Sequence, residues 1–156
     1  MGEKHSDLIN KSRAAFLKWR ALPAPERGNY IRLFGEALRE QKKEVANQIT
    51  FEAKKIISES EGEVQEVIDM CDFATGLSRQ LYGLTMPSER PNHRLQEIWQ
   101  PLGIVGCITA FNFPVAVFGW NFCLAAVCGN SIIWKPSPHS EGCADLTKKI
   151  WDYVAG

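Results

Sequence analysis

Two polar side chains at the ends of apolar segments, Asn112 and Lys135, could do chemistry. An amide N–H aimed at a developing oxyanion lowers a reaction barrier, and losing such a donor typically costs ~10²–10³ in rate. A lysine at the end of a strand can reach ribose hydroxyls or a phosphate as a point charge. Simpler interpretations compete with both, because Asn also caps helices and charged residues often mark where a strand reaches solvent.

The segments around Asn112 predict a strand followed by a helix. Gly103 to Phe111 is an apolar run of strand length with a β-rich composition. Pro114 suits the first turn of a helix, where its missing N–H costs nothing. Val115 to Cys128 has apolar residues on every face, which predicts a helix covered on all sides.

A second strand, Ser131 to Lys135, follows the helix stop at Gly129-Asn130. Strand, helix and strand over so short a span predict a βαβ unit with parallel strands. Ligands of open α/β sheets bind at the carboxyl ends of the strands, which here present Thr109 to Asn112 and Trp134-Lys135.

Other helices and a hairpin precede this unit. Five further helices are expected. The first begins at the Ser6-Asp7 cap, the second lies around Tyr30 to Leu38, the third runs from Lys42 through Ile56, the fourth runs from about Gly62 to Leu81, and the last starts at Glu141. Leu84–Met86 and Arg94–Gln100 flank a turn-rich segment and predict a hairpin. The fold class is therefore α/β. Two parallel strands cannot cover an apolar helix, so the chain is expected to be the first third of a larger α/β protein.

A longer pattern resembles a known family. P-L-G-I-V-G-x-I-x-x-F-N-F-P, Trp120, then G-N and W-K-P look like the first cofactor-domain segment of the aldehyde dehydrogenase superfamily. Ala110-Phe111 before the Asn, the stretch G-E-V-Q-E-V-I-D-M-C-D-F-A-T-G-L-S-R and the P-S-E-R after it resemble the antiquitin-like branch, the α-aminoadipic semialdehyde dehydrogenases. The resemblance covers the chain from about Ala14 onward.

The resemblance implies three parts. Residues 1–83 would form the helical part of the cofactor domain, residues 84–100 an oligomerisation hairpin, and residues 101–156 the first βαβ of a Rossmann-like NAD-binding sheet. The family's hairpin pairs across subunits, so a homo-oligomer, dimer or tetramer, is expected.

The resemblance also implies roles for the residues at the strand ends. Asn112 matches the family's oxyanion-hole Asn, Thr109, Ala110 and Phe111 would contact cofactor through their backbone, and Lys135 would bind the adenosine side of NAD(P). Most relatives have a ribose-binding Glu three residues after this Lys, where this chain has Pro138. The departure leaves NADP open, although the antiquitin-like branch shares the Pro and uses NAD.

Four further residues match substrate-binding positions of the family. Phe113, Ala116 and Trp120 fall where the aldehyde tunnel is lined, with the two aromatics seven apart on one helix face, although aromatics at this spacing are also ordinary core. Glu66, in E-V-Q-E, matches the Glu that binds the substrate's charged amino-acid end in the antiquitin-like branch. A solvated helix-face Glu is the alternative.

The family's nucleophile and base are absent. The chain has no G-Q-x-C and no E-L-G-G, and none of its five cysteines has the right neighbours. We therefore expect part of an NAD(P)-dependent aldehyde dehydrogenase that is not active alone, its aldehyde being α-aminoadipic semialdehyde by the branch resemblance. The alternative is a truncated non-catalytic remnant, or a fragment that binds nucleotide or another subunit.

Composition and charge also bear on which partners, compartment and metal the chain could have. The 18 basic and 18 acidic residues cancel without a basic stripe, which argues against nucleic acid as a partner. The uncharged helix would be only about 24 Å long, shorter than a ~30 Å bilayer core, and no membrane partner is expected. The polar N-terminus and five unpaired cysteines predict a reducing cytoplasm, and their spacing without a nearby His predicts no metal site.

Overall fold

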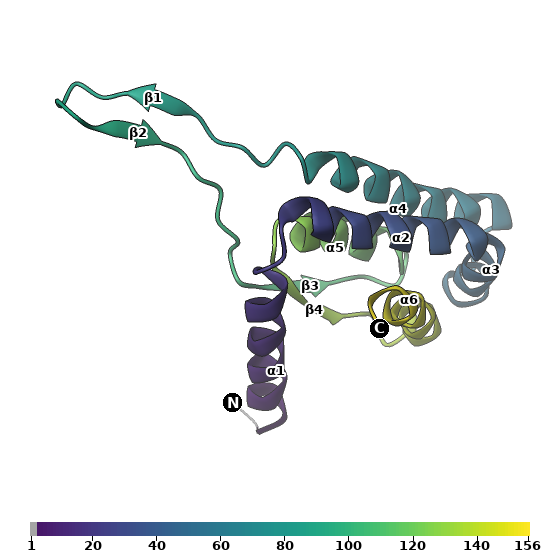
Figure 1. The fold of residues 1–156 in the computed structure, drawn as a ribbon. Coiled ribbons are helices and arrows are strands. Elements are labelled where there is room, and N and C mark those ends of the chain that lie inside the picture. Colours follow the sequence, from purple (N-terminus) through teal and green to yellow (C-terminus); the bar gives the residue numbers. More distant parts are fainter. Residues whose placement is uncertain (1–2) are drawn as a thin grey trace.

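The chain forms six helices and two small sheets in the computed structural model, which describes residues 3–156, with side chains from His5 onward. The elements in order are α1 (Glu3–Trp19), α2 (Ala24–Glu40), α3 (Lys42–Ala53), α4 (Ile57–Leu77), β1 (Thr85–Pro87), β2 (Arg94–Gln96), β3 (Ile104–Ile108), α5 (Ala116–Val127), β4 (Ser131–Lys135) and α6 (Glu141–Ala155) (Figure 1).

The predicted βαβ unit is confirmed. Strands β3 and β4 pair in parallel, with a register that runs from Ile104 opposite Ser131 to Ile108 opposite Lys135. Helix α5 connects them and packs on their sheet, while α2 and α4 cover the opposite side of α5. The layers are thus α2 and α4, then α5, then the two strands, and α1 contacts both strands while its N-terminal part extends beyond the stack (Figure 1).

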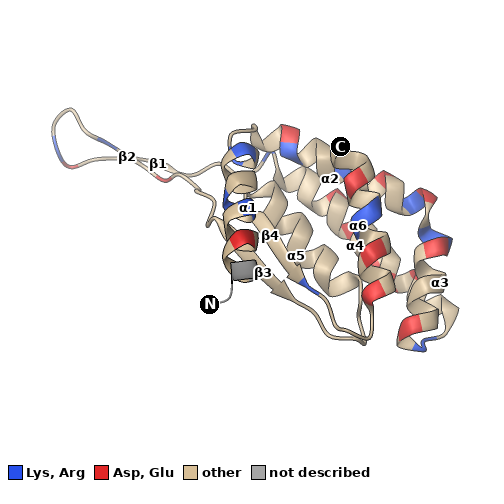
Figure 2. Cartoon of the chain, turned by 90° about the horizontal axis from the view of Figure 1, so that it is seen from below, with Lys and Arg blue, Asp and Glu red and all other residues tan. Residues whose placement is uncertain are grey.

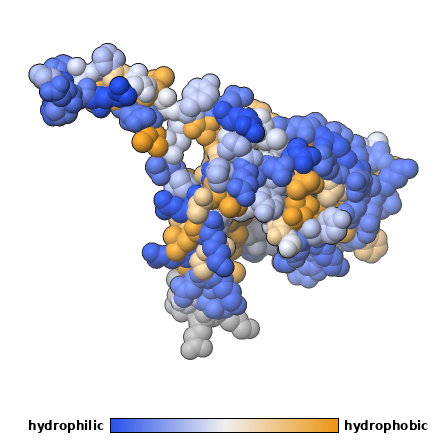
Figure 3. Space-filling view, in the orientation of Figure 1, coloured by the Kyte–Doolittle hydropathy of each residue, from blue (hydrophilic) through white to orange (hydrophobic). Residues whose placement is uncertain are grey.

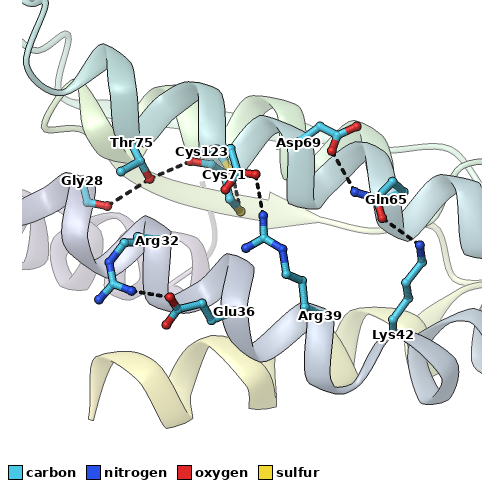
Figure 4. A network of polar contacts seen from close by, with 11 residues as sticks. Gly28, Arg32, Glu36, Arg39, Lys42, Gln65, Asp69, Cys71, Thr75 and Cys123 are labelled. Atoms are coloured by element: carbon cyan, nitrogen blue, oxygen red, sulfur yellow. Dashed lines mark hydrogen bonds and ion pairs between the residues drawn. The ribbon is translucent and has the colours of Figure 1, made fainter.

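Helices α4 and α5 approach closely because α5 contains Gly119. A Cβ at this position would lie 2.5 Å from Cγ1 of Val67. A mid-helix Gly costs roughly 0.5–1 kcal/mol relative to Ala, and close packing of the two helices offsets that cost. Polar contacts between α2 and α4 reinforce the same stack: Arg39 pairs with Asp72 at 2.5 Å, and the Thr75 hydroxyl donates to the Gly28 carbonyl at 3.3 Å (Figure 4).

Helix α5 carries no charge of its own, as its tan ribbon shows (Figure 2), and other helices supply charges at both of its ends. At the C-terminal end, Nε of the buried Arg27 donates to the Val127 carbonyl at 3.0 Å. At the N-terminal end, the carboxylate of Glu63 accepts two backbone N–H groups. A cation at the C-terminus and an anion at the N-terminus both complement the helix dipole.

The helix stop at Gly129 is confirmed, while other details of this unit differ from prediction. Gly129 has a φ of +89°, a conformation that glycine adopts without strain. Pro114 lies one residue before the N-cap Val115, so it is not in the first helical turn. Helix α5 is not covered on all sides, because Trp120 is 39% exposed. Strand β3 is shorter than predicted, and Ile108 is 79% exposed, since α5 packs on one face of the sheet only.

The boundaries of three earlier helices also differ from prediction. Helix α1 already contains Ser6-Asp7, where Asp7 pairs with Lys11 one turn on, so these residues are not its cap. Helix α3 ends at Ala53 because Lys54 adopts the left-handed conformation, with a φ of 59°. Helix α4 spans Ile57–Leu77 instead of the predicted Gly62–Leu81.

The hairpin is confirmed with shorter strands than predicted. Strands β1 and β2 pair antiparallel, with Thr85 opposite Gln96, and the hairpin projects away from the helices (Figure 1). Its strand residues are exposed. Across residues 3–156, helices of the length and apolarity that a membrane crossing requires are not found.

Candidate active site

The predicted site residues at the strand ends lie at one edge of the β3–β4 sheet. Thr109 to Asn112 directly follow β3, and Lys135 ends β4 opposite Ile108. The Thr109 N–H donates to the Lys135 carbonyl at 3.2 Å, which extends the ladder by one residue. The structure therefore brings these residues together, as parallel pairing requires.

Thr109 is fixed by its neighbours. Its side chain is buried, and its hydroxyl accepts a hydrogen bond from the Trp134 indole N–H at 3.0 Å. The Trp134 ring stacks on Phe118 of α5, with ring centroids 3.7 Å apart and an interplanar angle of 13°. The exit of β3 is therefore tied to both β4 and α5.

The backbone beyond Thr109 is available to a ligand. Ala110, Phe111 and Asn112 are exposed, and within residues 3–156 their backbone groups make no hydrogen bond to a helix or strand. The side-chain amide of Asn112 makes none either, so the alternative in which it caps α5 is wrong. The exposed ammonium of Lys135 forms no ion pair with a described residue. Unpaired polar groups thus cluster at this edge.

The start of α5 is held by two residues that the sequence analysis missed. Oε1 of Glu63 accepts the N–H groups of Val115 at 2.8 Å and Ala116 at 3.1 Å. Its Oε2 pairs with the Lys55 ammonium at 2.5 Å, and the same ammonium lies 3.7 Å from the Phe113 ring centroid. Glu63 lies four residues before Val67 on the apolar stripe of α4, and this position of a charge was the available signal.

The four predicted substrate residues are placed as follows. Phe113 lies in the turn before α5, so it does not share a helix face with Trp120, and both rings are about two-fifths exposed, at 40% and 39%. Ala116 is fully buried in the first turn of α5. Glu66 is exposed on α4, less than one turn after Glu63, and has no ion pair within the described part of the chain.

The cysteines do not have the properties of nucleophiles. Four of the five are buried, and Cys128 is half-buried. Burial raises the pKa of Cys107 and Cys128, and a hydrogen bond with Cys71 together with burial raises the pKa of Cys123. Burial and the neighbouring Glu52 likewise raise the pKa of Cys143 far above its usual range. A raised pKa keeps each of these thiols protonated at neutral pH.

A wide apolar hollow lies elsewhere. Its volume is about 1050 Å³, and α1, β4 and α6 form its walls with apolar and aromatic side chains such as Trp19 and Trp151. None of the predicted site residues lines it. Apolar side chains also reach the surface near α1 and the hairpin base (Figure 3). From His5 onward, no three His, Cys, Asp or Glu side chains gather as metal ligands would.

A parallel βαβ unit with unpaired polar groups at the carboxyl ends of its strands defines the class: an α/β protein of the kind that binds ligands at that edge of its sheet. The sequence matches the profile of the aldehyde dehydrogenase family over residues 2–155. The chain belongs to the aldehyde dehydrogenase family.

Several known proteins are similar to the chain. It is 51% identical over 146 residues to the α-aminoadipic semialdehyde dehydrogenase of Rattus norvegicus, which covers 94% of this chain and 27% of the rat protein. It is 54% identical over 136 residues to aldehyde dehydrogenase family 7 member A1 of Malus domestica, which covers 87% of this chain and 27% of that protein. The branch resemblance is therefore confirmed.

Solved structures agree on the fold. The lactaldehyde dehydrogenase of Escherichia coli superposes with a TM-score of 0.90 at 30% identity, over 94% of this chain and 31% of that one. A glyceraldehyde-3-phosphate dehydrogenase of Methanocaldococcus jannaschii, complexed with NADP, gives 0.91 at 25% identity, over 97% and 33%. The chain thus spans between a quarter and a third of the length of these relatives.

Proposed function

We propose that this chain supplies the oxyanion donor and one side of the cofactor site of an NAD-dependent aldehyde dehydrogenase that oxidises α-aminoadipic semialdehyde. One observation carries the proposal: exposed residues 110–112 and Lys135 present unpaired polar groups at one sheet edge. The 51% identity to the rat semialdehyde dehydrogenase supports the substrate.

The chemistry follows from the groups at this edge. The Asn112 amide would donate to the aldehyde oxygen as negative charge develops on it, which is the moment at which a preorganised donor is most effective. Phe113 and Trp120 would line the approach of the aldehyde, and Glu66 would meet the substrate's ammonium group. The 156 residues contain neither the G-Q-x-C motif of the nucleophilic thiolate nor the E-L-G-G motif of the general base.

The residues at this edge fit a dinucleotide. Lys135 would contact ribose hydroxyls or phosphate, and the backbone of Thr109 to Phe111 would line the cofactor. The cofactor accepts the hydride when bound. Pro138 stands where most relatives have a Glu that would repel a 2′-phosphate, so NADP is the competing cofactor. NAD is proposed on the branch resemblance alone.

A segment exchange tests the proposal. This chain replaces the segment of the rat enzyme that it matches, and the purified hybrid is assayed with α-aminoadipic semialdehyde and either NAD or NADP. We expect turnover with NAD at a higher kcat/KM than with NADP. A folded hybrid that oxidises no aldehyde would contradict the proposal. The 156-residue chain alone should produce no NADH, because it carries no G-Q-x-C nucleophile.

The hairpin and the thiols support two further parts of the proposal. We expect the exposed β1–β2 hairpin to pair with that of a second subunit, since an unpaired strand edge favours association. Sedimentation of the hybrid with and without Leu95→Lys in β2 tests this expectation. Five free cysteines fit a reducing compartment such as the cytoplasm, which fluorescence microscopy of a tagged protein would test.

A further inference from the structure

Residues 110–113 between β3 and α5 have few restraints of their own. Their backbone forms no hydrogen bond to a helix or strand within residues 3–156, and Asn112 lies in the middle of the turn. The position of Asn112 therefore depends on what holds the two ends. One end is Thr109, which Trp134 and the Lys135 carbonyl fix. The other end is the start of α5.

The start of α5 depends on a carboxylate from another helix. Its N-cap is the apolar Val115, and no acidic residue lies in its first turn. The first N–H groups of a helix need acceptors, and here Oε1 of Glu63 accepts two of them. The Glu63 side chain is 0% exposed and belongs to the rigid helix α4, so it sets where α5 begins.

Lys55 extends this anchor toward the turn. Its ammonium, 14% exposed on the side chain, lies between the Glu63 carboxylate and the face of the Phe113 ring, 3.7 Å from the ring centroid. A cation over an aromatic face is attracted to it, more strongly where water is excluded. Phe113 directly follows Asn112, so Lys55 holds the residue next to the proposed oxyanion donor.

We infer that Glu63 and Lys55 are positioning residues: they fix the start of α5 and the Phe113 ring and thereby hold the Asn112 amide in place. The inference rests on the role proposed for Asn112. Neither residue touches the reacting atoms; both act through the turn.

Hydrogen exchange tests the anchor in the 156-residue chain. Glu63→Gln keeps the shape and one acceptor oxygen but loses the charge and the pairing with Lys55. Because hydrogen bonds to charged groups are the stronger ones, we expect the Val115 and Ala116 amides to exchange at least about tenfold faster. The double variant Lys55→Met/Glu63→Gln replaces the ion pair by a neutral pair of similar shape. It serves as the second test, because the single variant could misfold when one buried charge is left unpaired.

Glu52→Gln is the matched control. Glu52 accepts the Gly142 and Cys143 N–H groups at the start of α6, both at 2.8 Å, so it performs the same task away from Asn112. Its replacement should speed exchange at the start of α6 and leave residues 109–116 unchanged. Unchanged exchange at Val115 and Ala116 in both Glu63 variants would overturn the inference.

Kinetics of the rat hybrid separate positioning from plain stability. Glu63→Gln and Lys55→Met should lower kcat about tenfold or more with the KM for NAD within about twofold, and Lys55→Arg should restore most of the rate. A kcat loss no larger than that of Glu52→Gln would overturn the inference. Asn112→Ala is judged separately: an unchanged kcat there refutes the proposed function, while the exchange data still decide whether Glu63 anchors the turn.

Discussion

The first N–H groups of α5 and of α6 both need acceptors, and the two helix starts meet this need with carboxylates in different surroundings. Both helices follow a strand, and neither N-cap residue makes a side-chain cap. Each is capped by a glutamate from an earlier helix, Glu63 from α4 and Glu52 from α3. Glu63 is fully buried and paired with Lys55, whereas Glu52 is half-buried and pairs with no lysine within the described residues.

The difference follows from what each helix start adjoins. The cap of α5 lies under the exposed turn that carries Asn112, where a charge open to water would leave the turn loosely held. Burial strengthens the hydrogen bonds of Glu63 but also demands a countercharge, which Lys55 supplies. The start of α6 carries no predicted site residue, and its cap is only half-buried. The buried cap whose charge is neutralised, Glu63 paired with Lys55, is therefore the one next to the candidate site.

The largest expected effect is the loss of the buried cap. Glu63→Ala leaves the Lys55 charge and two N–H groups without a partner, and breaking a buried pair typically costs 3–5 kcal/mol. Glu52→Ala should cost about 1–2 kcal/mol, as the loss of a capping side chain typically does. Urea unfolding of both variants measures the difference. Equal losses would show that the two caps are not distinct.

The opposite end of α5 should respond less strongly. Arg27→Met removes the charged donor to the Val127 and Leu22 carbonyls, and a hydrogen bond to a charged group contributes about 1.5–3 kcal/mol. Urea unfolding should place its loss below that of Glu63→Ala, because no buried countercharge is left behind. A loss greater than that of Glu63→Ala would move the main anchor of α5 to its C-terminus.

The half-buried cap should respond to pH. Burial by itself raises the pKa of Glu52, but hydrogen bonds from the Cys143 thiol and from the Cys143 and Gly142 N–H groups outweigh it and lower the pKa below its ordinary 4.5. A lowered carboxyl pKa stabilises the fold above 4.5, and the gain is lost as pH falls through the folded-state value.

The measurement is the free energy of unfolding of the wild type and of Glu52→Gln between pH 3 and 7. The advantage of the wild type should be full at neutral pH and shrink on acidification below 4.5. An advantage that grows on acidification would show that the carboxylate form is not the one that caps α6.

The smallest expected effect concerns the link between the two caps. Lys54 adopts a φ of 59° where α3 ends, and this turn leads the chain from Glu52 to Lys55. Glycine adopts such a conformation without steric cost, so Lys54→Gly should stabilise the chain by less than about 1 kcal/mol. Thermal unfolding checks the sign, and a clear destabilisation would mean that the Lys54 side chain contributes more than its backbone strain costs.

Local patterns predicted much of the fold. The strand Ser131–Lys135, the stop at Gly129 and the parallel pairing follow from composition, glycine conformation and connection length, and all three are found. Helix boundaries were less predictable. The end of α3 at Lys54 depends on a left-handed lysine, which no propensity favours, and the start of α4 at Ile57 has no polar cap to mark it.

The parts of the candidate site that depend on neighbouring residues in the sequence were predictable, whereas the contacts between residues far apart in the sequence were not. Asn112 and Lys135 stand at strand ends that the sequence itself defines. Glu63 and Arg27 act on backbone groups 52 and 100 residues away, so no spacing rule pairs them with α5. The position of Glu63 on an apolar stripe indicates burial but does not identify its partner. Contrary to the prediction, Phe113 does not share a helix face with Trp120, because α5 begins only after Pro114, at the start that Glu63 caps.

The central claim is that this segment contributes the oxyanion donor. Its most direct test is the kcat of the rat hybrid with Asn112→Ala, measured with saturating α-aminoadipic semialdehyde and NAD. We expect kcat to fall by ~10²–10³ while the KM for NAD stays within about twofold, as expected when a donor that acts in the transition state is lost. A kcat within about twofold of the parent hybrid would contradict the claim.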